Sequence, residues 1–199
     1  MTRWEPGARE RLNGAALELY ASKGFEETTV AEIAQAAGLT ERTFFRYFAD
    51  KREVLFAGSE LLEQQFVDGA ATAPKDATPI EVVRSAVGAS AVFFPDERRE
   101  YSRLRATIID ANPPLQEREL RKMSTLAAVL TTALRARGIP ESVATIAAQT
   151  GVTVFRVSFA QWIAPGSTRP MAHIQRDVFA ELGALTSELS GSLTGATPK

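Results

Sequence analysis

Hydrophobic positions recur at helical spacing along most of the chain. Residues 7–22 carry one such stripe, formed by Leu12, Ala15, Ala16, Leu19 and Tyr20. Comparable stripes and helix-start signals predict further helices over residues 50–67, 79–94, 96–111, 114–137, 140–163 and from 170 onward. Residues 152–157 alternate like a strand, but their flanks carry no strand boundaries, so a helix is predicted there too. The pattern therefore indicates an all-α protein.

Two short helices around a glycine are predicted within residues 29–48. Thr29 and Glu32 have the spacing of a capping box, in which each residue bonds the backbone of the other. Gly38 provides the backbone freedom that ends the first helix, and Thr40 is placed to cap the second. This arrangement of two helices at a tight corner is typical of a helix-turn-helix motif.

The second short helix, Glu41 to Phe48, has one apolar face and one polar face. Phe44 and Phe48 are four residues apart and would anchor the helix to a core. The side chains predicted to point elsewhere are suited to phosphates and base edges, namely Arg42, Thr43, Arg46 and Tyr47. Residues 42–52 hold four basic residues and one acid, which is the densest positive charge in the first third of the chain.

These motifs resemble the N-terminal DNA-binding domain of the TetR family of transcriptional regulators. The resemblance covers about residues 8–62 and rests on Gly24-Phe25, Thr28-Thr29-Val30, Ile33-Ala34, Ala37-Gly38-Leu39, Thr43-Phe44-Phe45-Arg46-Tyr47-Phe48 and Lys51. It implies an all-α fold of about nine helices. A three-helix DNA-binding domain would occupy residues 1–50, with its helix-turn-helix at 29–48. A ligand-binding and dimerisation domain would follow at 51–189, and the Ser-, Gly- and Thr-rich residues 190–199 are expected to form a disordered tail.

The resemblance also implies DNA contacts for individual residues. Thr43 and Phe45 match positions that touch bases in the major groove, and Arg42 lies beside them, where it could reach guanine. Positions that contact phosphates are matched by Thr29, Thr40, Tyr47 and Lys51. Many relatives have tyrosine where this chain has Phe45, which packs either on a thymine methyl or on its neighbours. Arg46 is either a DNA contact or a solvated basic residue.

Composition and charge limit the alternatives. The formal net charge is −1, and residues 1–61 hold eight basic against ten acidic residues, so DNA binding must rest on local placement of charge. The absence of cysteine excludes disulfides and is compatible with a reducing compartment. No signal-peptide pattern is present and no apolar run reaches about 18 residues, so a soluble, cytoplasmic chain is expected.

For the C-terminal part, the resemblance implies a pocket for a small apolar or amphipathic effector. The candidate apolar lining is Phe93, Phe94, Ile108, Met123, Leu126, Phe155, Phe159 and Trp162. The candidate polar contacts are Arg105, Gln149, Thr153 and Arg156. Each aromatic residue could equally be ordinary core, and Arg105 or Arg156 could form a surface or interface salt bridge.

Homodimerisation through the last two helices is also expected, since two-fold symmetric proteins read two DNA half-sites. A seam in the last helix, with Met171, Ile174, Val178, Leu182, Leu185 and Leu189, supports a dimer but could pack within one chain. The predicted helix over 50–67 would be long enough to join both domains, so effector binding could tilt it and separate the recognition helices. Repression of a palindromic operator is the expected outcome.

An enzyme is the first rival hypothesis, and the residues argue against it. The single histidine, His173, lies in a predicted interface helix, and there is no cysteine and no glycine-rich phosphate loop. No catalytic residue, metal site or cofactor is therefore predicted. A ligand-independent architectural DNA-binding protein is the second rival, and only a ligand-binding experiment separates it from a sensor.

Overall fold

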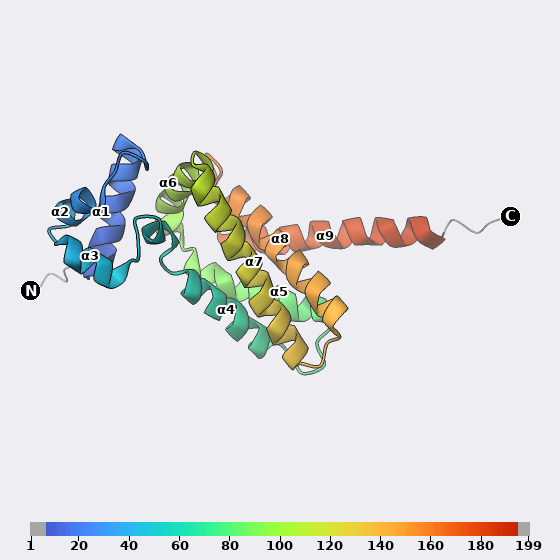
Figure 1. Cartoon of the computed structure of the whole chain (residues 1–199). Helices are drawn as coiled ribbons and strands as arrows, with labels where there is room; N and C mark the ends of the chain where they lie inside the picture. The colour runs from blue at the N-terminus through green and yellow to red at the C-terminus, as the bar shows by residue number, and fades with distance from the viewer. Residues whose placement is uncertain (1–6, 195–199) are drawn as a thin grey trace, which may run out of the picture. The chain divides into compact units, whose positions relative to one another are not determined.

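The computed structural model describes residues 7–194, with side chains to residue 188, and every regular element in this range is a helix (Figure 1). Its α-helices are α1 Ala8–Lys23, α2 Val30–Ala36, α3 Glu41–Tyr47, α4 Ser59–Thr72, α5 Pro79–Ala89, α6 Arg99–Asp110, α7 Pro113–Ala136, α8 Glu141–Ile163 and α9 Met171–Thr194. Three short 3-10 helices are η1 Glu53–Phe56, η2 Ser90–Phe93 and η3 Asp96–Arg98. The predicted all-α class is thereby confirmed for the described range.

The chain divides into two compact units. Unit 1 contains Met1–Glu60 and Glu100–Lys122, and unit 2 contains Leu61–Arg99 and Met123–Lys199. This division reflects how the helices pack. It differs from the predicted domain boundary between residues 50 and 51. Helix α9 also continues to Thr194, beyond the predicted start of a disordered tail at 190, whereas residues 195–199 lie outside the described range.

The core of unit 1 joins α1, α2 and α3 to η1, α6 and the start of α7. Its completely buried side chains include Leu12, Ile33, Phe44 and Leu115. The expected capping box starts α2, because Thr29 Oγ1 accepts from the Glu32 amide at 3.2 Å and Glu32 Oε2 accepts from the Thr29 amide at 2.9 Å. The helix-turn-helix over residues 29–48 thus has the local chemistry predicted for it.

The predicted continuous helix over residues 50–67 is wrong. Asp50 Oδ1 accepts from the amides of Arg52 at 2.8 Å and Glu53 at 3.2 Å, which starts a turn that leads into η1. Three consecutive buried residues, Val54–Phe56, then face the core, which one α-helical face cannot provide. Gly58 has a φ of +91°, in the left-handed region, so the α-helix begins only afterwards.

Lys51 has a structural role in unit 1. Its Nζ donates to the carbonyl oxygens of Phe25 at 2.8 Å, Glu26 at 2.9 Å and Thr28 at 3.0 Å, and it lies 4.6 Å from the centroid of the Phe25 ring. An ammonium group has three donors, so these carbonyls occupy all of them. The Lys51 carbonyl in turn accepts from the Tyr20 hydroxyl at 2.6 Å. Lys51 therefore fastens the segment between α3 and η1 to the α1–α2 loop.

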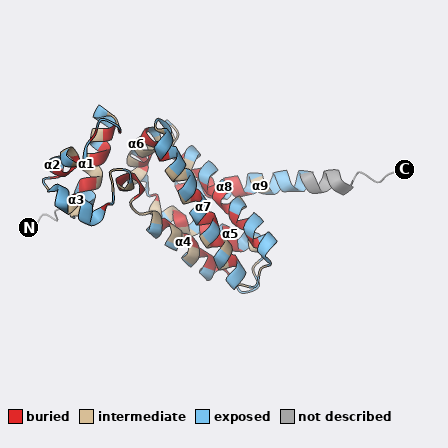
Figure 2. Cartoon of the chain, in the orientation of Figure 1, coloured by how far each residue is buried: buried red, intermediate tan, exposed pale blue. Residues whose placement is uncertain are grey.

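In unit 2, α5 and α8 form the centre of a helical bundle, and α8 also packs against α9 (Figure 1). Figure 2 shows buried positions along the packed sides of these helices and exposed positions over residues 183–188 of α9. Small residues allow neighbouring helices to approach each other closely. A Cβ atom added at Gly151 of α8 would lie 2.6 Å from Val83 Cγ1 of α5. Helix spacing in this unit is thus set by glycine as well as by large side chains.

Helix α8 has the length and the mean hydropathy, 1.3, of a membrane-spanning helix. Its other properties are those of a core helix. Gly151, Phe155, Ser158 and Trp162 are all buried within unit 2. The apolar character of α8 is therefore accounted for by packing against α5 and α9.

The apolar seam predicted in the last helix serves two environments. Met171, Ile174 and Val178 are buried in the core of unit 2, so this half of the seam packs within the chain. Leu185 lies in the second half of α9 and is 59% exposed. The side chain of Leu189 lies outside the described range. The seam alone is thus weaker support for a dimer than the sequence indicated.

Helix α4 packs so closely on α5 that Gly69→Ala is predicted to destabilise the protein. The new Cβ would lie 2.8 Å from both Ala86 Cα and the Ser85 carbonyl oxygen, which are backbone atoms that cannot rotate away. Overpacking of this kind costs about 1–3 kcal/mol. Gly88→Ala is the matched control, since nothing lies within 4 Å of its Cβ position. Urea unfolding should show a loss for the first variant and none for the second, and equal midpoints would contradict the close packing.

Lys51→Met should lower the free energy of unfolding, because the variant leaves three carbonyls without their charged donor. Hydrogen bonds to charged groups contribute about 1.5–3 kcal/mol, and part of this stabilisation should disappear. Arg52→Met is the control, since Arg52 pairs with Asp50 at the surface. Thermal unfolding of both variants measures the difference. If Lys51→Met unfolds like the wild type, the carbonyl contacts contribute nothing.

Candidate nucleic-acid interface

Helix α3 presents a polar face because its other face is anchored in the core. Thr40 Oγ1 accepts from the Thr43 amide at 3.2 Å and caps the first turn. Phe44 is completely buried, and its ring lies 5.5 Å from that of Phe48. A helix of seven residues is marginal by itself, so this anchoring determines both its presence and its orientation.

The exposed face of α3 holds most of the predicted DNA contacts. Arg42, Phe45, Arg46 and Tyr47 are all exposed. The ring of Phe45 is 55% exposed, which is unusual for a large apolar side chain, and it makes an edge contact with Phe44. Arg46 donates to the Tyr47 hydroxyl at 3.2 Å and lies over its ring at 5.0 Å. The face therefore combines two guanidinium groups, a phenol and an exposed aromatic ring.

Three threonines lie at the starts of α2 and α3. The hydroxyls of Thr40 and Thr43 are 3.0 Å apart, and Thr29 shares its hydroxyl with the Glu32 carboxylate. Hydrogen bonds from Lys23 and from the Thr29 backbone lower the pKa of Glu32 to about 2. The first turn of α2 is thus held by a carboxylate that stays ionised through neutral pH. The hydroxyls of Thr29 and Thr40 are near the surface but already serve as helix caps.

The ammonium group of Lys51 is not available for a phosphate, since it is bonded to three carbonyls. This placement argues against the phosphate contact predicted for it. Sequence inspection could not find these carbonyls, which lie at least 23 residues away along the chain. The sequence also provided no signal for Arg9 of α1, an exposed residue whose guanidinium lies 5.7 Å from the Phe48 ring at the end of α3.

The predicted effector-binding residues do not form one group. Arg105 and Ile108 belong to unit 1, where Arg105 bonds the Leu55 carbonyl and Glu119, so their assignment to the pocket is corrected. Gln149, Thr153 and Arg156 are exposed on α8, because they lie on the helix face opposite Phe155 and Trp162. Helical spacing alone did not distinguish these two faces, and the corrected candidate pocket lacks all five residues.

The remaining candidates lie together in unit 2. They are Phe93, Phe94, Met123, Leu126, Phe155, Phe159 and Trp162. Phe94 is in ring contact with Phe155, Phe159 and Trp162 at centroid distances of 5.4–5.6 Å. Nearby on α8, Ser158 Oγ and Trp162 Nε1 are buried without a hydrogen-bond partner within the described range. Such groups are uncommon in folded proteins because each is costly to bury.

A metal centre is not indicated by the described residues, among which no group of three or more His, Cys, Asp or Glu side chains is placed to hold an ion. His173 lies on the exposed side of α9, beside Arg176 in an open groove. The neighbouring carboxylate, Asp177, is already paired with Arg169.

Comparison of sequences agrees with the geometry of α3. Residues 14–57 match the profile of the family described as "Bacterial regulatory proteins, tetR family". The transcriptional regulator TcmR of Streptomyces glaucescens is 36% identical over 78 residues, which cover 39% of this chain and 34% of that protein. The chain thus matches only about a third of the length of this relative.

Comparison of structures extends the likeness of fold to most of the chain. A transcriptional regulator of the TerR/AcrR family from Aquifex aeolicus has a TM-score of 0.56 and 17% identity, covering 90% of this chain and 99% of that one. The TetR-family regulator PfmR from Thermus thermophilus has a TM-score of 0.50 and 24% identity, covering 84% and 93%. These identities show a shared fold only.

The expectation against an enzyme is confirmed by the family, whose members regulate transcription. The helix-turn-helix over residues 29–48, the profile match over residues 14–57 and the shared all-α fold all indicate the same conclusion. The chain carries the DNA-binding domain of the TetR family of transcriptional regulators.

Proposed function

We propose that α3 enters the major groove of DNA and reads base edges there. The observation that carries this proposal is the exposed face of α3, which is polar apart from Phe45 and is held outward by buried Phe44. Arg42 and Thr43 lie in the first turn, where side chains reach bases in helix-turn-helix proteins. Phe45 can pack on a thymine methyl. Tyr47, Thr29 and Thr40 are proposed to contact phosphates, and Arg46 to contribute charge.

A homodimer formed through α8 and α9 is the proposed DNA-binding form. Val143, Ile146 and Val157 are exposed and lie on one face of α8. Thr150 and Thr153, on the same face, donate their hydroxyls to carbonyls of their own helix, at 2.8 and 3.0 Å. These two hydroxyls therefore need no acceptor outside α8, which suits residues at the centre of an interface. Two copies related by two-fold symmetry would read a palindromic operator.

A small apolar or amphipathic effector is proposed to bind among the aromatic residues of unit 2. The unpartnered Ser158 hydroxyl and Trp162 indole N–H support this proposal, because a polar group on the effector could satisfy them. Effector binding would then change the separation of the two α3 helices and release the operator. The protein would act as a repressor in the cytoplasm, since occupation of promoter DNA needs no further contact with polymerase.

Selection from a random DNA pool should yield an inverted repeat, and variants should then divide by role. Arg42→Gln should weaken binding by about 1–3 kcal/mol and relax specificity at one position of each half-site. Tyr47→Phe should weaken binding to all sequences equally. Arg84→Gln, at an exposed position of α5 in unit 2, is the matched control. Fluorescence anisotropy measures each affinity. An asymmetric selected sequence would contradict the dimer, and unchanged affinity of both α3 variants would contradict the interface.

Thermal-shift screening against apolar and amphipathic compounds should identify stabilising ligands, because a ligand bound only by the folded state raises the melting temperature. Trp162→Phe keeps an aromatic ring but removes the indole donor. Compounds with a carbonyl group should lose much of their shift in this variant, whereas hydrocarbons of the same shape should not. The alternative function, a ligand-independent DNA-binding protein, would be supported if no compound stabilised the wild type or changed its affinity for the operator.

A further inference from the structure

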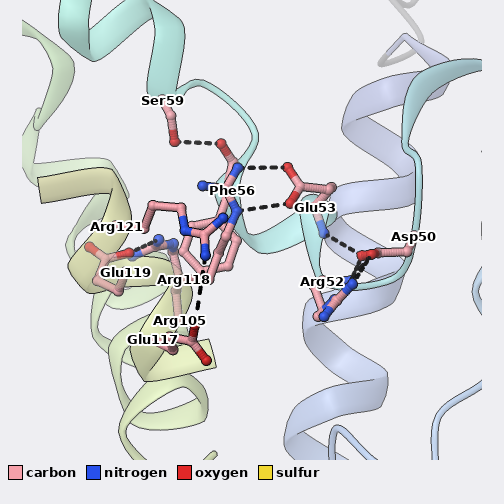
Figure 3. A network of polar contacts seen from close by, with 10 residues as sticks. All are labelled: Asp50, Arg52, Glu53, Phe56, Ser59, Arg105, Glu117, Arg118, Glu119 and Arg121. Carbon is pink, nitrogen blue, oxygen red and sulfur yellow. Dashed lines mark hydrogen bonds and ion pairs between the residues drawn. The ribbon is translucent and has the colours of Figure 1, made fainter. Parts of the chain in front are cut away.

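Phe56 of η1 lies between two arginines in unit 1. The guanidinium carbons of Arg105 in α6 and Arg118 in α7 are each 5.2 Å from the centroid of its ring (Figure 3). The ring itself is 4% exposed. Cations over an aromatic face at this distance attract it electrostatically, and more strongly where water is excluded. The segment that follows the helix-turn-helix is thus bound to two helices from later in the chain.

Each of these arginines is also held by a carboxylate. Arg118 forms a two-point pair with Glu53 of η1, with Nε to Oε1 at 2.9 Å and Nη2 to Oε2 at 3.1 Å. Arg105 donates to the Leu55 carbonyl at 2.5 Å and to Glu119 at 2.7 Å. A pair with two parallel hydrogen bonds fixes the orientation of the guanidinium relative to the carboxylate as well as the distance between them. We refer to Glu53, Phe56, Arg105, Arg118 and Glu119 as the Phe56 clamp.

The charges of the clamp are stabilised by its geometry. Burial by itself would raise the pKa of Glu119, but the nearby charges of Arg105 and Lys122 outweigh it and lower the pKa. The hydrogen bonds to Glu53 raise the pKa of Arg118. Arg118 and Glu119 therefore both favour their charged forms.

The chain passes between the two units at three places, which differ in local structure. The first lies after Glu60 in α4, two residues beyond Gly58, whose left-handed backbone interrupts the helix. The second lies at the first residue of α6, Arg99. The third lies inside α7, between Lys122 and Met123, with several helical turns on either side. Arg118 and Glu119 of the clamp lie one turn before this third place.

We propose that the Phe56 clamp positions the DNA-reading helices, and that a change in unit 2 reaches α3 through α7 and the clamp rather than along α4. The inference rests on the proposed function. A helix interrupted at Gly58 transmits direction poorly, whereas α7 is uninterrupted and is bonded to η1 at its unit 1 end. The clamp residues are positioning residues that do not themselves touch DNA.

The test compares full-length variants on two DNA duplexes, the palindrome selected by the wild type and a single half-site. Arg118→Met keeps the aliphatic stem but removes the charge, and Glu53→Gln removes the opposite charge. Both should retain half-site affinity within about twofold, since α3 is intact, and lose about tenfold on the palindrome, since two misaligned readers forfeit the gain from simultaneous binding. The charge-swapped double variant, E53R with R118E, should recover part of that loss.

Two further variants make the comparison specific. Arg121→Met removes an exposed arginine one turn along α7, whose ion pair with Glu117 is at the surface, and should bind both duplexes like the wild type. Insertion of two glycines after Gly58 makes the connection between η1 and α4 longer and more flexible. This variant should change palindrome affinity by no more than about twofold, because the clamp still holds η1. Circular dichroism and thermal unfolding confirm that each variant is folded.

Several outcomes would overturn the inference. Palindrome binding by Arg118→Met and Glu53→Gln at wild-type affinity would show that the clamp positions nothing. Equal losses on half-site and palindrome would show a general structural role. If the glycine insertion weakened palindrome binding as much as Arg118→Met, the route would run through α4. A wild-type chain that selected no DNA sequence would instead refute the proposed function, and this inference with it.

Discussion

The burial of Phe44 is the constraint on which the DNA-reading surface depends. Helix α3 is too short to be stable in isolation, so its conformation comes from the core beneath it. Once Phe44 is completely buried, helical geometry leaves Arg42, Phe45 and Arg46 directed away from the core. The cap at Thr40 and the glycine turn before it then determine where this face begins.

Positive charge in unit 1 is divided between two uses, and the division explains how a slightly acidic region can still bind DNA. Lys51, Arg105 and Arg118 are bonded to carbonyl or carboxylate oxygens of the protein itself. Arg42 and Arg46 remain on the exposed face of α3. Because phosphate contact depends on a few well-placed donors, the availability of individual cations matters more than their number.

Local signals predicted much of the fold and of the candidate interface. The capping box at Thr29 and the apolar pair in α3 act over a few residues, so their effects could be inferred from spacing. Contacts between residues far apart in the sequence could not be inferred in this way. The Gly58 interruption follows from burial of three consecutive residues in a core assembled from α1, α6 and α7. Arg105 likewise bonds a carbonyl 50 residues away, and no pattern along the chain marks that partner.

The packing of Phe56 has a consequence for recombination between relatives. Exchanges that graft the first 58 residues of this chain onto a different C-terminal part would separate Glu53 and Phe56 from Arg105 and Arg118. The smallest portable DNA-binding module is therefore discontinuous, since it also requires the segment from Glu100 to Lys122. Hybrid regulators built from this scaffold would need to inherit both segments from one parent.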